Sequence, residues 1–408
     1  MRFLRTVSTR RLLAGLAGLI IVAVAGSAIA VAAAGNGPVP KKRSLASAIH
    51  KTLSAKSVKG LSANITFTDN LVSSNDIQGS DPLLTGAPGR LWVGDGRIRL
   101  ELQSDNGDAQ VVVNHGSFSI YDPAMNVVYR GKLPASSAKT ARASSAKSQA
   151  DSVPTIAQIQ KALKRVAAHL GISGATPTDV GGRPAYRVAV SPKSGGGLIG
   201  DLKLAWDATH GVPLDFAVYA KGNSTPVLEL KATGISYARV PVSDFEIRPP
   251  SGTKVVNLTL PKTASASGSS RSKSDKHAGT KEITGVAAVR KHVSFTLTAP
   301  ASLAGRSRHS VSLIGGAGHH GAMLFYGKGL GGIIVIERPA SAGGSMLPSS
   351  SSENGPGLML PTASIDGATA QQLPTPLGTV LQFTRQGVSY VLIGSVTATT
   401  ADRAARGL

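Results

Sequence analysis

Residues 202–219 read LKLAWDATHGVPLDFAVY, and this stretch decides the fold that the sequence predicts. Apolar and polar or small side chains alternate before and after a short turn at residues 209–211. Alternation with a period of two is typical of a half-buried strand, and two such runs joined by a tight turn favour an antiparallel pair with one apolar face.

The same pattern continues on both sides of this stretch. A strand is predicted at residues 186–190, and another follows the turn Lys221-Gly222-Asn223 at residues 228–231. Pro249 and Pro250 close the run, and they must lie at a strand end or an edge because proline donates no ladder hydrogen bond. Residues 179–255 therefore predict consecutive antiparallel strands that share one apolar face.

Four short motifs stand in order along this part of the chain: Gly181-Gly182-Arg183-Pro184-x-Tyr186, Trp206-Asp207, Gly211-x-Pro213-Leu214 and Phe245-x-Ile247-x-Pro249-Pro250-x-Gly252. Their order and spacing resemble the LolA-like lipoprotein-carrier superfamily, including its MucB/RseB branch. Gly116, Tyr121 and Asp122 stand in further matching positions, whereas His115 replaces the acidic residue expected before that glycine. The resemblance implies a half-open β-barrel that binds or carries a lipid or a lipidated protein.

Composition excludes several classes of site. The chain of 408 residues contains no cysteine, which rules out disulfides, thiolate metal sites and a lipid-modified cysteine. The net charge of +22 raises the possibility of nucleic acid, but aromatic residues make up 4% of the chain and do not interleave with the basic stretches. We therefore predict no nucleic-acid partner and interpret the basic stretches as solvated linkers, with attraction to anionic lipid headgroups as the functional alternative.

The N-terminus predicts export. Basic residues up to Arg11 precede an uncharged run at residues 12–34, which is long enough to span a bilayer of about 30 Å. Small residues at 28–30 and 32–34 also fit a cleavage site, so a cleaved signal and an uncleaved anchor both remain open. The length favours the anchor, and the protein is placed on the extracytoplasmic face of a bacterial cell membrane.

The predicted fold class is mainly β with α (α+β), a curved antiparallel sheet or half-open barrel covered by helices, plus a smaller mostly-β C-terminal domain. A Ser/Lys-rich stretch with no apolar period separates the two. The predicted divisions are a signal or anchor at 1–40, a LolA-like domain at 44–260, a linker at 261–281 and a small domain at 282–408. Strands of the small domain are expected at 293–297, 311–314, 323–326, 333–336, 379–383 and 390–393, with a short helix after residue 400.

Two amphipathic helices are predicted in the larger domain. The first begins after Ser44, a good N-cap, and is followed by Gly60. The second spans residues 155–170, and it has to lie across the sheet to bury its apolar stripe, Ile156, Ile159, Leu163 and Val166. The resemblance implies that this helix is a lid over a concave face, and an ordinary core-covering helix fits the pattern equally well.

The apolar face of the sheet is the candidate ligand cavity. One or two helices are few to cover eight or more strands, which leaves room for a ligand. For any single residue, plain core is the simpler interpretation. The residues predicted to line the cavity are Ile65, Phe67, Trp92, Leu100, Val113, Phe118, Leu204, Trp206, Phe216 and Leu230.

Catalytic motifs are missing from the sequence. It has no P-loop, nucleophile elbow, zinc-protease motif or dinucleotide fingerprint. His319-His320 has no nearby carboxylate, and Asp207 with His210 at a strand end is typical of local hydrogen bonding. We predict no enzyme activity, no metal and no cofactor.

Two functions follow from these patterns. The first is a lipid- or lipoprotein-binding carrier that shelters acyl chains and contacts the cytoplasmic membrane through its N-terminal segment. The second, implied by the MucB/RseB branch, is a regulatory envelope-sensing protein that binds an anti-sigma factor or another envelope protein. An adjacent sigma/anti-sigma gene pair would favour the second.

Overall fold

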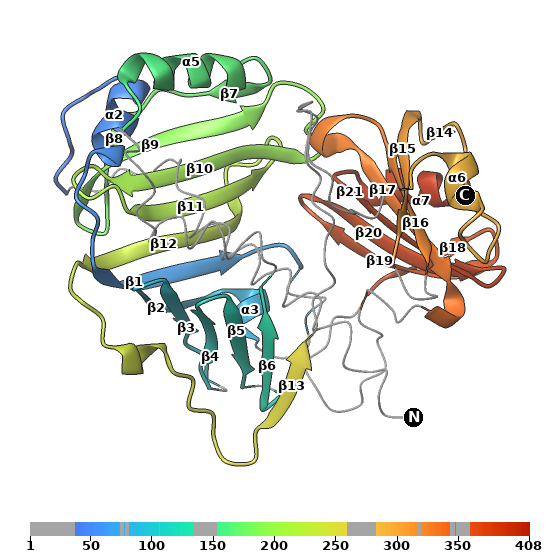
Figure 1. Cartoon of the computed structure of the whole chain (residues 1–408), viewed down its shortest axis with the longest axis horizontal. Coiled ribbons are helices and arrows are strands. Elements are labelled where there is room, and N and C mark those ends of the chain that lie inside the picture. Colours follow the sequence, from blue (N-terminus) through green and yellow to red (C-terminus); the bar gives the residue numbers. More distant parts are fainter. Residues whose placement is uncertain are drawn as a thin grey trace, which may run out of the picture.

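A computed structural model describes residues 37–73, 77, 81–105, 107–123, 125–133, 153–258, 283–315, 320–342, 347 and 360–408. Among these residues, no helix combines the length and the apolar character needed to cross a bilayer. The predicted signal or anchor at residues 12–34 and the predicted linker at 261–281 lie outside the described residues. The described chain is mainly β with few helices, as the sequence predicts (Figure 1).

The strands between residues 60 and 258 form one curled sheet, the first sheet, for which 13 strands are described. Its strands are β1 (Gly60–Asp69), β2 (Ala87–Gly94), β3 (Arg97–Leu102), β4 (Ala109–Asn114), β5 (Ser117–Asp122), β6 (Val127–Lys132), β7 (Leu170–Ile172), β8 (Thr176–Val180), β9 (Arg183–Pro192), β10 (Ile199–Asp207), β11 (Pro213–Ala220), β12 (Pro226–Ser236) and β13 (Lys254–Leu258).

The first sheet joins two antiparallel meanders. Its order is β13-β6-β5-β4-β3-β2-β1-β12-β11-β10-β9-β7, with β8 paired to β9. Tight turns connect several of the neighbours within each meander, such as the turn at Asp95 and Gly96, both with positive φ, between β2 and β3. The meanders meet where β1 pairs with β12, and β13 closes the far end by pairing parallel to β6.

Short helices accompany the first sheet: α2 (Leu45–Leu53), α3 (Pro82–Thr85), α5 (Ile156–Val166) and the 3-10 helix η2 (Val242–Phe245). The predicted N-cap Ser44 is confirmed, because its side chain accepts from the backbone N–H of Ser47; Thr155, which the structure shows as the N-cap of α5, forms a capping box with Gln158. The helix predicted over 155–170 ends early, at Val166, because Leu170 already pairs with Pro192 as the start of β7.

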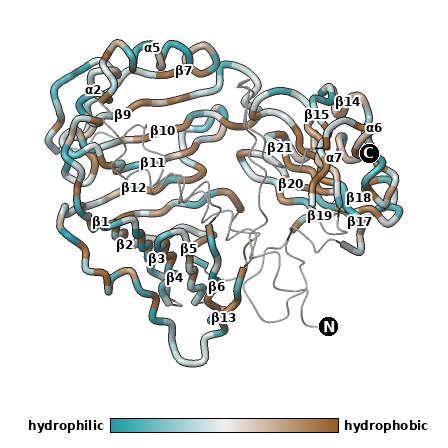
Figure 2. The backbone as a smooth tube through the Cα atoms, viewed as in Figure 1, coloured by the Kyte–Doolittle hydropathy of each residue, from teal (hydrophilic) through white to brown (hydrophobic). Residues whose placement is uncertain are grey.

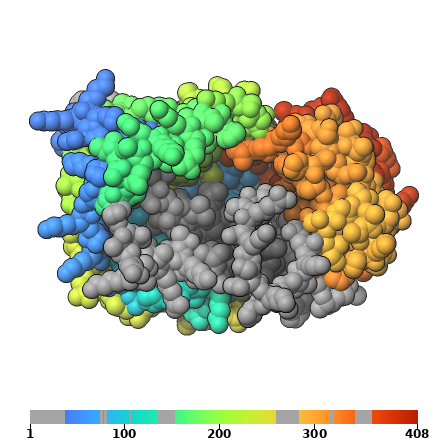
Figure 3. Space-filling view, turned by 45° about the horizontal axis from the view of Figure 1, so that its top comes forward, coloured from blue at the N-terminus to red at the C-terminus, as the bar shows by residue number. Residues whose placement is uncertain are grey.

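Helix α5 does not lie directly over the strands as predicted. It packs mainly against α2, and Figure 3 shows the two helices side by side on the outside of the molecule, α2 in blue and α5 in green. The ring of His50 in α2 also contacts the carbonyl of Pro154 at 2.9 Å. Of the predicted stripe, only Ile159 is buried, Leu163 is half-buried, and Ile156 and Val166 are exposed.

The remaining strands form a second sheet of eight strands with the order β14-β15-β16-β17-β21-β20-β19-β18. Helix α7 contacts its strands β18, β20 and β21. The elements of this part are α6 (Val286–Arg290), β14 (Ser302–Leu303), β15 (Arg306–Ile314), β16 (Gly321–Tyr326), η3 (Gly329–Gly331), β17 (Ile333–Pro339), η4 (Ala340–Ala342), β18 (Thr362–Ile365), β19 (Ala368–Thr375), β20 (Gly378–Arg385), β21 (Val388–Gly394) and α7 (Ala398–Arg406).

One strand predicted for the second sheet is wrong. Residues 293–297 form no strand, although Leu297 is buried in the core. The segment is held by a side chain instead, since the backbone N–H of Thr298 donates to Glu337 Oε2 at 2.9 Å. Glu337 has no exposed surface, and burial raises the pKa of its carboxyl to about 7.

The two sheets contact each other at several points in the described part of the chain. At one of them, the β9–β10 loop meets the end of β21, where the backbone N–H of Leu198 donates to Ser395 Oγ at 2.9 Å and Ser395 Oγ donates to the carbonyl of Gly196 at 3.3 Å. Another contact is apolar and joins side chains of the loop after β1 to the outer side of β19 and β20. Its residues are Val72, Ile77, Leu84, Leu347, Leu360, Leu373 and Val380.

Candidate functional site

One face of the first sheet carries apolar side chains across most of its strands. A row of facing residues crosses four neighbouring strands, from Leu204 through Phe216 and Leu230 to Phe67. Because facing residues project to the same side of a sheet, these four side chains lie on one face, which we call the apolar face. Figure 2 shows the alternation of hydrophobic and hydrophilic residues along these strands.

A second row extends the apolar face to the other edge of the sheet. It crosses seven strands from β1 to β13 through Ala63, Leu91, Leu100, Val111, Ile120, Tyr129 and Val256. Ile65 lies two residues along β1 from Ala63, and Val113 faces Phe118 in the neighbouring row. The structure therefore places most of the predicted cavity residues on this face: Ile65, Phe67, Leu100, Val113, Phe118, Leu204, Phe216 and Leu230.

A pocket of about 230 Å³ opens on the apolar face between the two meanders. Ile65, Phe216 and Leu230 line it, and Phe216 and Leu230 are only half-buried. The remaining lining residues are Val58, Leu61, Ala63, Leu91, Val93, Val212, Pro213, Leu214, Asp215, Ala232 and Ile235. The sequence pattern missed most of them, since alternation marks the face and not the place on it where packing leaves a gap.

Trp206 lies apart from this pocket. It packs with Tyr186 and with Ala48 of α2 in a separate buried cluster, with the two rings tilted at a centroid distance of 6.0 Å. Helix α2 therefore covers the β9–β10 end of the sheet, and Trp206 is part of the surface on which α2 packs.

Trp92 is a correction, because it does not join the cavity residues. It faces Ser62 on β1 and Arg99 on β3, both on the opposite, polar face. Leu91 and Val93 on either side of it are also apolar, so the sequence could not show which of the three side chains point to the apolar face.

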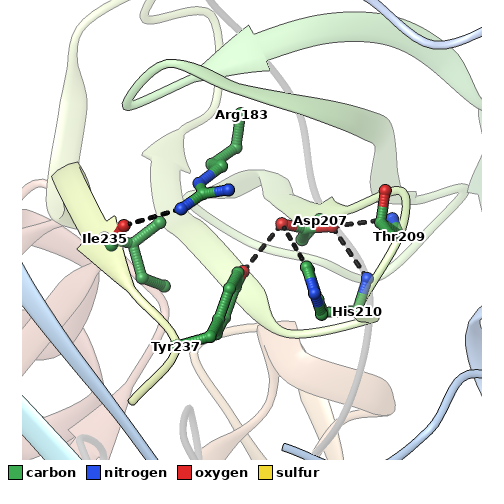
Figure 4. Close-up of polar contacts among 6 residues, drawn as sticks. All are labelled: Arg183, Asp207, Thr209, His210, Ile235 and Tyr237. Carbon is green, nitrogen blue, oxygen red and sulfur yellow. Dashed lines mark hydrogen bonds and ion pairs between the residues drawn. The ribbon is translucent and has the colours of Figure 1, made fainter.

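A hydrogen-bonded network at Asp207 fixes the turn that supports α2 (Figure 4). The buried Asp207 Oδ1 accepts from the backbone N–H groups of Thr209 at 2.6 Å and His210 at 2.8 Å. Its Oδ2 accepts from Tyr237 Oη at 2.7 Å and lies 3.3 Å from His210 Nδ1. The network ties the β10–β11 turn to the chain after β12, and Arg183 stacks over Tyr237 at 5.2 Å.

The hydrogen bonds decide the charge of Asp207. Burial alone raises the pKa of this carboxyl, but the donors from His210, Tyr237 and Thr209 outweigh burial and lower the pKa below its usual value. A carboxylate held ionised by fixed donors is a structural anchor. The contact with His210 that the sequence indicates as local hydrogen bonding is present in the structure.

Gly211 brings the end of this turn against α2. It has φ of +72°, and a Cβ there would lie 2.7 Å from Thr52 Cγ2 and 3.1 Å from the Thr52 carbonyl. We expect Gly211→Ala to lower the free energy of unfolding by about 2 kcal/mol, because both the left-handed backbone and the contact oppose a side chain. Urea unfolding measures the change.

Gly222→Ala is the matched control for that prediction. Gly222 also has positive φ, +77°, but a Cβ there meets nothing within 4 Å. Gly222→Ala should lower the free energy of unfolding by about 1 kcal/mol, because only the left-handed backbone opposes the new side chain. Equal losses for the two variants would contradict a close packing of α2 on the turn.

Asp215 is a buried carboxyl on β11 next to the pocket residue Phe216, and its register with Ala205 and Lys231 places it on the opposite face of the sheet. It is 2% exposed, neither of its oxygens has a hydrogen-bond partner among the described residues, and burial raises its pKa to about 7. Ala205 lies between Asp215 and Arg187 in the register, and this small residue leaves space for the two side chains to approach each other. The attraction is purely electrostatic, since Nε and Nη2 of Arg187 are likewise without partners in the described part of the chain.

No metal centre is assembled in the described part of the chain. Its residues hold no group of three or more His, Asp or Glu placed to bind a metal ion. His319 lies outside the described residues, so the predicted absence of a site at His319-His320 stays a prediction.

Comparison with known proteins returns structures but no sequence relatives. No family model and no curated protein matches the chain. The Pseudomonas aeruginosa MucA/MucB complex matches with 13% identity and a TM-score of 0.39, over 88% of this chain and 96% of that chain. A crystal structure of MucB matches with 16% identity and a TM-score of 0.37, over 88% and 96%.

A shorter uncharacterized conserved protein from Thermus thermophilus matches with 11% identity and a TM-score of 0.31, over 52% of this chain and 97% of that chain. TM-scores of this size carry no conclusion about function. The chain is similar to these structures of MucB, and no more is concluded from matches of this size.

Proposed function

We propose that the apolar face of the first sheet binds the acyl chain of a lipid or a lipidated protein. The observation that carries the proposal is the pocket of about 230 Å³ between Ile65, Phe216 and Leu230, on a face that is apolar across most strands of the sheet. Soluble proteins usually fill such a face with core packing, so an opening there is typical of a ligand site.

Burial of the chain supplies the binding energy. Each methylene moved from water into the pocket contributes about 0.8 kcal/mol, so a few methylenes suffice for binding without a covalent step. The pocket takes the end of one chain, and a whole lipid needs a wider opening between the sheet and the helices.

Helix α5, which packs on α2 beside the β9–β10 end of the sheet, is the proposed gate. Of the stripe on α5, only Ile159 is buried, while Ile156 and Val166 are 39% and 45% exposed. Displacing a helix that buries so little apolar surface costs little free energy, which supports a cover that opens.

Photo-crosslinking in the full chain tests the proposal. The chain is placed in lipid nanodiscs with a small fraction of a diazirine-bearing palmitic acid analogue, irradiated, digested and mapped by mass spectrometry. We expect labelled peptides from β1, β11 and β12. Labels confined to residues 1–36 would mean that the N-terminal segment alone meets lipid, and the proposal would fail.

Two variants sharpen this experiment. Phe216→Asp places a charge in the pocket and should reduce the labelling of β1 and β12 at least tenfold. Ala232→Leu fills the pocket without a charge and should give a similar loss while keeping the fold by circular dichroism. Thr66→Asp, exposed on the opposite face of β1, is the control and should label like the unmodified chain.

The regulatory alternative stays a prediction. The neighbouring structures show MucB with MucA, but the similarity is too low to carry that partner to this chain. An adjacent sigma/anti-sigma gene pair, followed by co-purification of the anti-sigma protein, would favour it over the carrier. Extracytoplasmic location is likewise proposed from the N-terminal sequence, which lies outside the described residues.

A further inference from the structure

The polar face of the first sheet, opposite the apolar face, carries a second pocket beside Trp92. Register places one row of side chains across β3, β2, β1 and β12: Arg99, Trp92, Ser62 and Ser236. The adjacent row contains Glu101, Arg90, Asn64 and Gly234. The tryptophan therefore has an arginine on one side and small or polar residues on the other.

Arg99 holds the ring of Trp92 from one side. Its guanidinium carbon lies 5.3 Å from the ring centroid. The guanidinium is itself fixed by Glu101 Oε2 at 2.6 Å and by the carbonyls of Asp244 at 3.1 Å and Glu246 at 3.3 Å. A flat ring backed by a tethered cation is preorganised, so a ligand that stacks on it does not have to order it.

The other side of the ring is open. A pocket of about 410 Å³ adjoins Trp92, and its lining residues are Ser62, Ala63, Asn64, Arg90, Trp92, Gly234, Ile235 and Ser236. Gly234 keeps it open, because a Cβ built on this residue finds only Asn64 Nδ2 within 4 Å, at 3.9 Å. The pairing of β1 with β12 is also irregular between Asn64 and Ile65, next to this glycine.

The lining groups fit a sugar ring. An aromatic face accepts the apolar C–H face of a pyranose, and hydroxyl and amide groups at Ser62, Asn64 and Ser236 match its hydroxyls. Arg90 is exposed, and the acidic side chain that faces it, Glu101, is already paired with Arg99, so the Arg90 guanidinium can bind a carboxylate. A purely aromatic ligand would leave all of these polar groups unused.

We propose that the Trp92 pocket binds a saccharide unit of an acidic glycan, with Trp92 stacking on the ring and Arg90 pairing with its carboxylate. This site goes beyond the proposed lipid binding, because Trp92 and Arg90 lie on the other face of the sheet; Ala63 and Ile235 border both pockets. Glycan and acyl chain can bind at the same time.

Fluorine NMR on the full chain tests the proposal. The chain contains two tryptophans, so labelling with 5-fluorotryptophan gives one signal from Trp92 and one from Trp206, which is 3% exposed. The probe is the trimer of galacturonic acid, with neutral maltotriose for comparison. We expect a saturable shift of the Trp92 signal, no shift of the Trp206 signal and weaker binding of maltotriose.

Two pairs of variants separate a built site from charge attraction. Gly234→Val fills the pocket and should abolish the shift, whereas Gly174→Val, where a Cβ meets nothing within 4 Å, should leave it intact. Arg90→Gln should weaken binding about tenfold, equivalent to about 1.4 kcal/mol. Arg130→Gln, which removes the same charge from an exposed position on the same polar face, should not.

Three results would overturn the proposal. They are the absence of any shift of the Trp92 signal at millimolar trisaccharide, a shift that survives Gly234→Val, and equal weakening by Arg90→Gln and Arg130→Gln. The last result would assign the binding to the net charge of the chain alone. Loss of palmitate crosslinking leaves this experiment unchanged, so the two proposals fail separately.

Discussion

Replacing Asp207 by alanine should lower the free energy of unfolding by about 3 kcal/mol. The substitution removes an acceptor for two backbone N–H groups and the Tyr237 hydroxyl, and it leaves buried donors without partners. It also frees the turn that contacts α2, so the helix should lose protection together with the turn. Urea unfolding and amide hydrogen exchange of residues 45–53 measure the two effects.

Controls for this prediction use charge and pH. Asp201→Ala removes the same charge from a half-buried position of the same strand and should change stability by less than about 0.5 kcal/mol. Because the pKa of Asp207 is lowered in the fold, its contribution is present above the unfolded pKa and lost as pH falls through the folded pKa. The difference between Asp207→Ala and the unmodified chain should therefore shrink in acid, and a constant difference would contradict an ionised anchor.

Replacing Asp215 by asparagine should raise the free energy of unfolding at pH 8, on the order of 3 kcal/mol, whereas Asp207→Ala lowers it. The carboxyl is buried without a hydrogen-bond partner in the described part of the chain, and its pKa rises from 3.8 to about 7. A pKa change of one corresponds to about 1.36 kcal/mol, which sets an upper value of about 4 kcal/mol for the cost of ionising Asp215 in the fold. Thermal and urea unfolding at a series of pH values measure the gain.

The pH dependence identifies the cause of that gain. A carboxyl whose folded pKa is raised contributes its stability below the unfolded pKa and loses it as pH rises through the folded value, here between about pH 4 and 7. Asp215→Asn should thus give little gain at pH 4 and the full gain at pH 8. Asp105→Asn, which is exposed, should give none. A loss at pH 8 would mean that attraction to Arg187 and Lys231 outweighs burial.

Two other buried carboxyls, Asp69 and Glu337, also make the unmodified chain less stable as pH rises. Each of these carboxyls has a raised pKa of about 7. Together with Asp215 they lower the stability of the fold as pH rises, whereas the stabilising contribution of Asp207 is lost only at lower pH. The stability of the whole protein should therefore be highest in mildly acidic solution, and the Asp215 variant should move that optimum toward neutral pH.

Local sequence patterns predicted most elements correctly where a physical signal is carried by a few neighbouring residues. The Ser44 cap marked the start of α2, because a side-chain acceptor is needed for the first free N–H groups of a helix, and the apolar stripe after residue 155 marked α5. Alternation marked β10 and β11 and their turn. The same patterns missed β18 and β19, whose polar residues, such as Gln371 and Thr369, give no clear apolar face.

The sequence predicted which side of the sheet is apolar, but it did not predict where on that side a pocket lies. Alternation placed Phe67, Phe216 and Leu230 on one side, and the facing row in the structure confirms that they lie together. It could not assign Trp92, since three consecutive apolar residues fit either face. Nor could it show that α5 packs on α2. An amphipathic stripe indicates that one face of a helix is buried, but it does not identify the element against which that face packs.

The sequence by itself determined most of the strands, their apolar face, the helix cap at Ser44 and the lack of cysteine chemistry, because each is encoded in residues near one another in the chain. Only the tertiary structure decided that β1 lies beside β12 and that β13 runs parallel to β6. These pairings join segments far apart in the chain. Every residue type except proline can form the backbone hydrogen bonds between strands, so the local sequence does not specify which strands pair. The lipid pocket and the Trp92 pocket both depend on the β1–β12 pairing, so neither site exists before the two meanders meet.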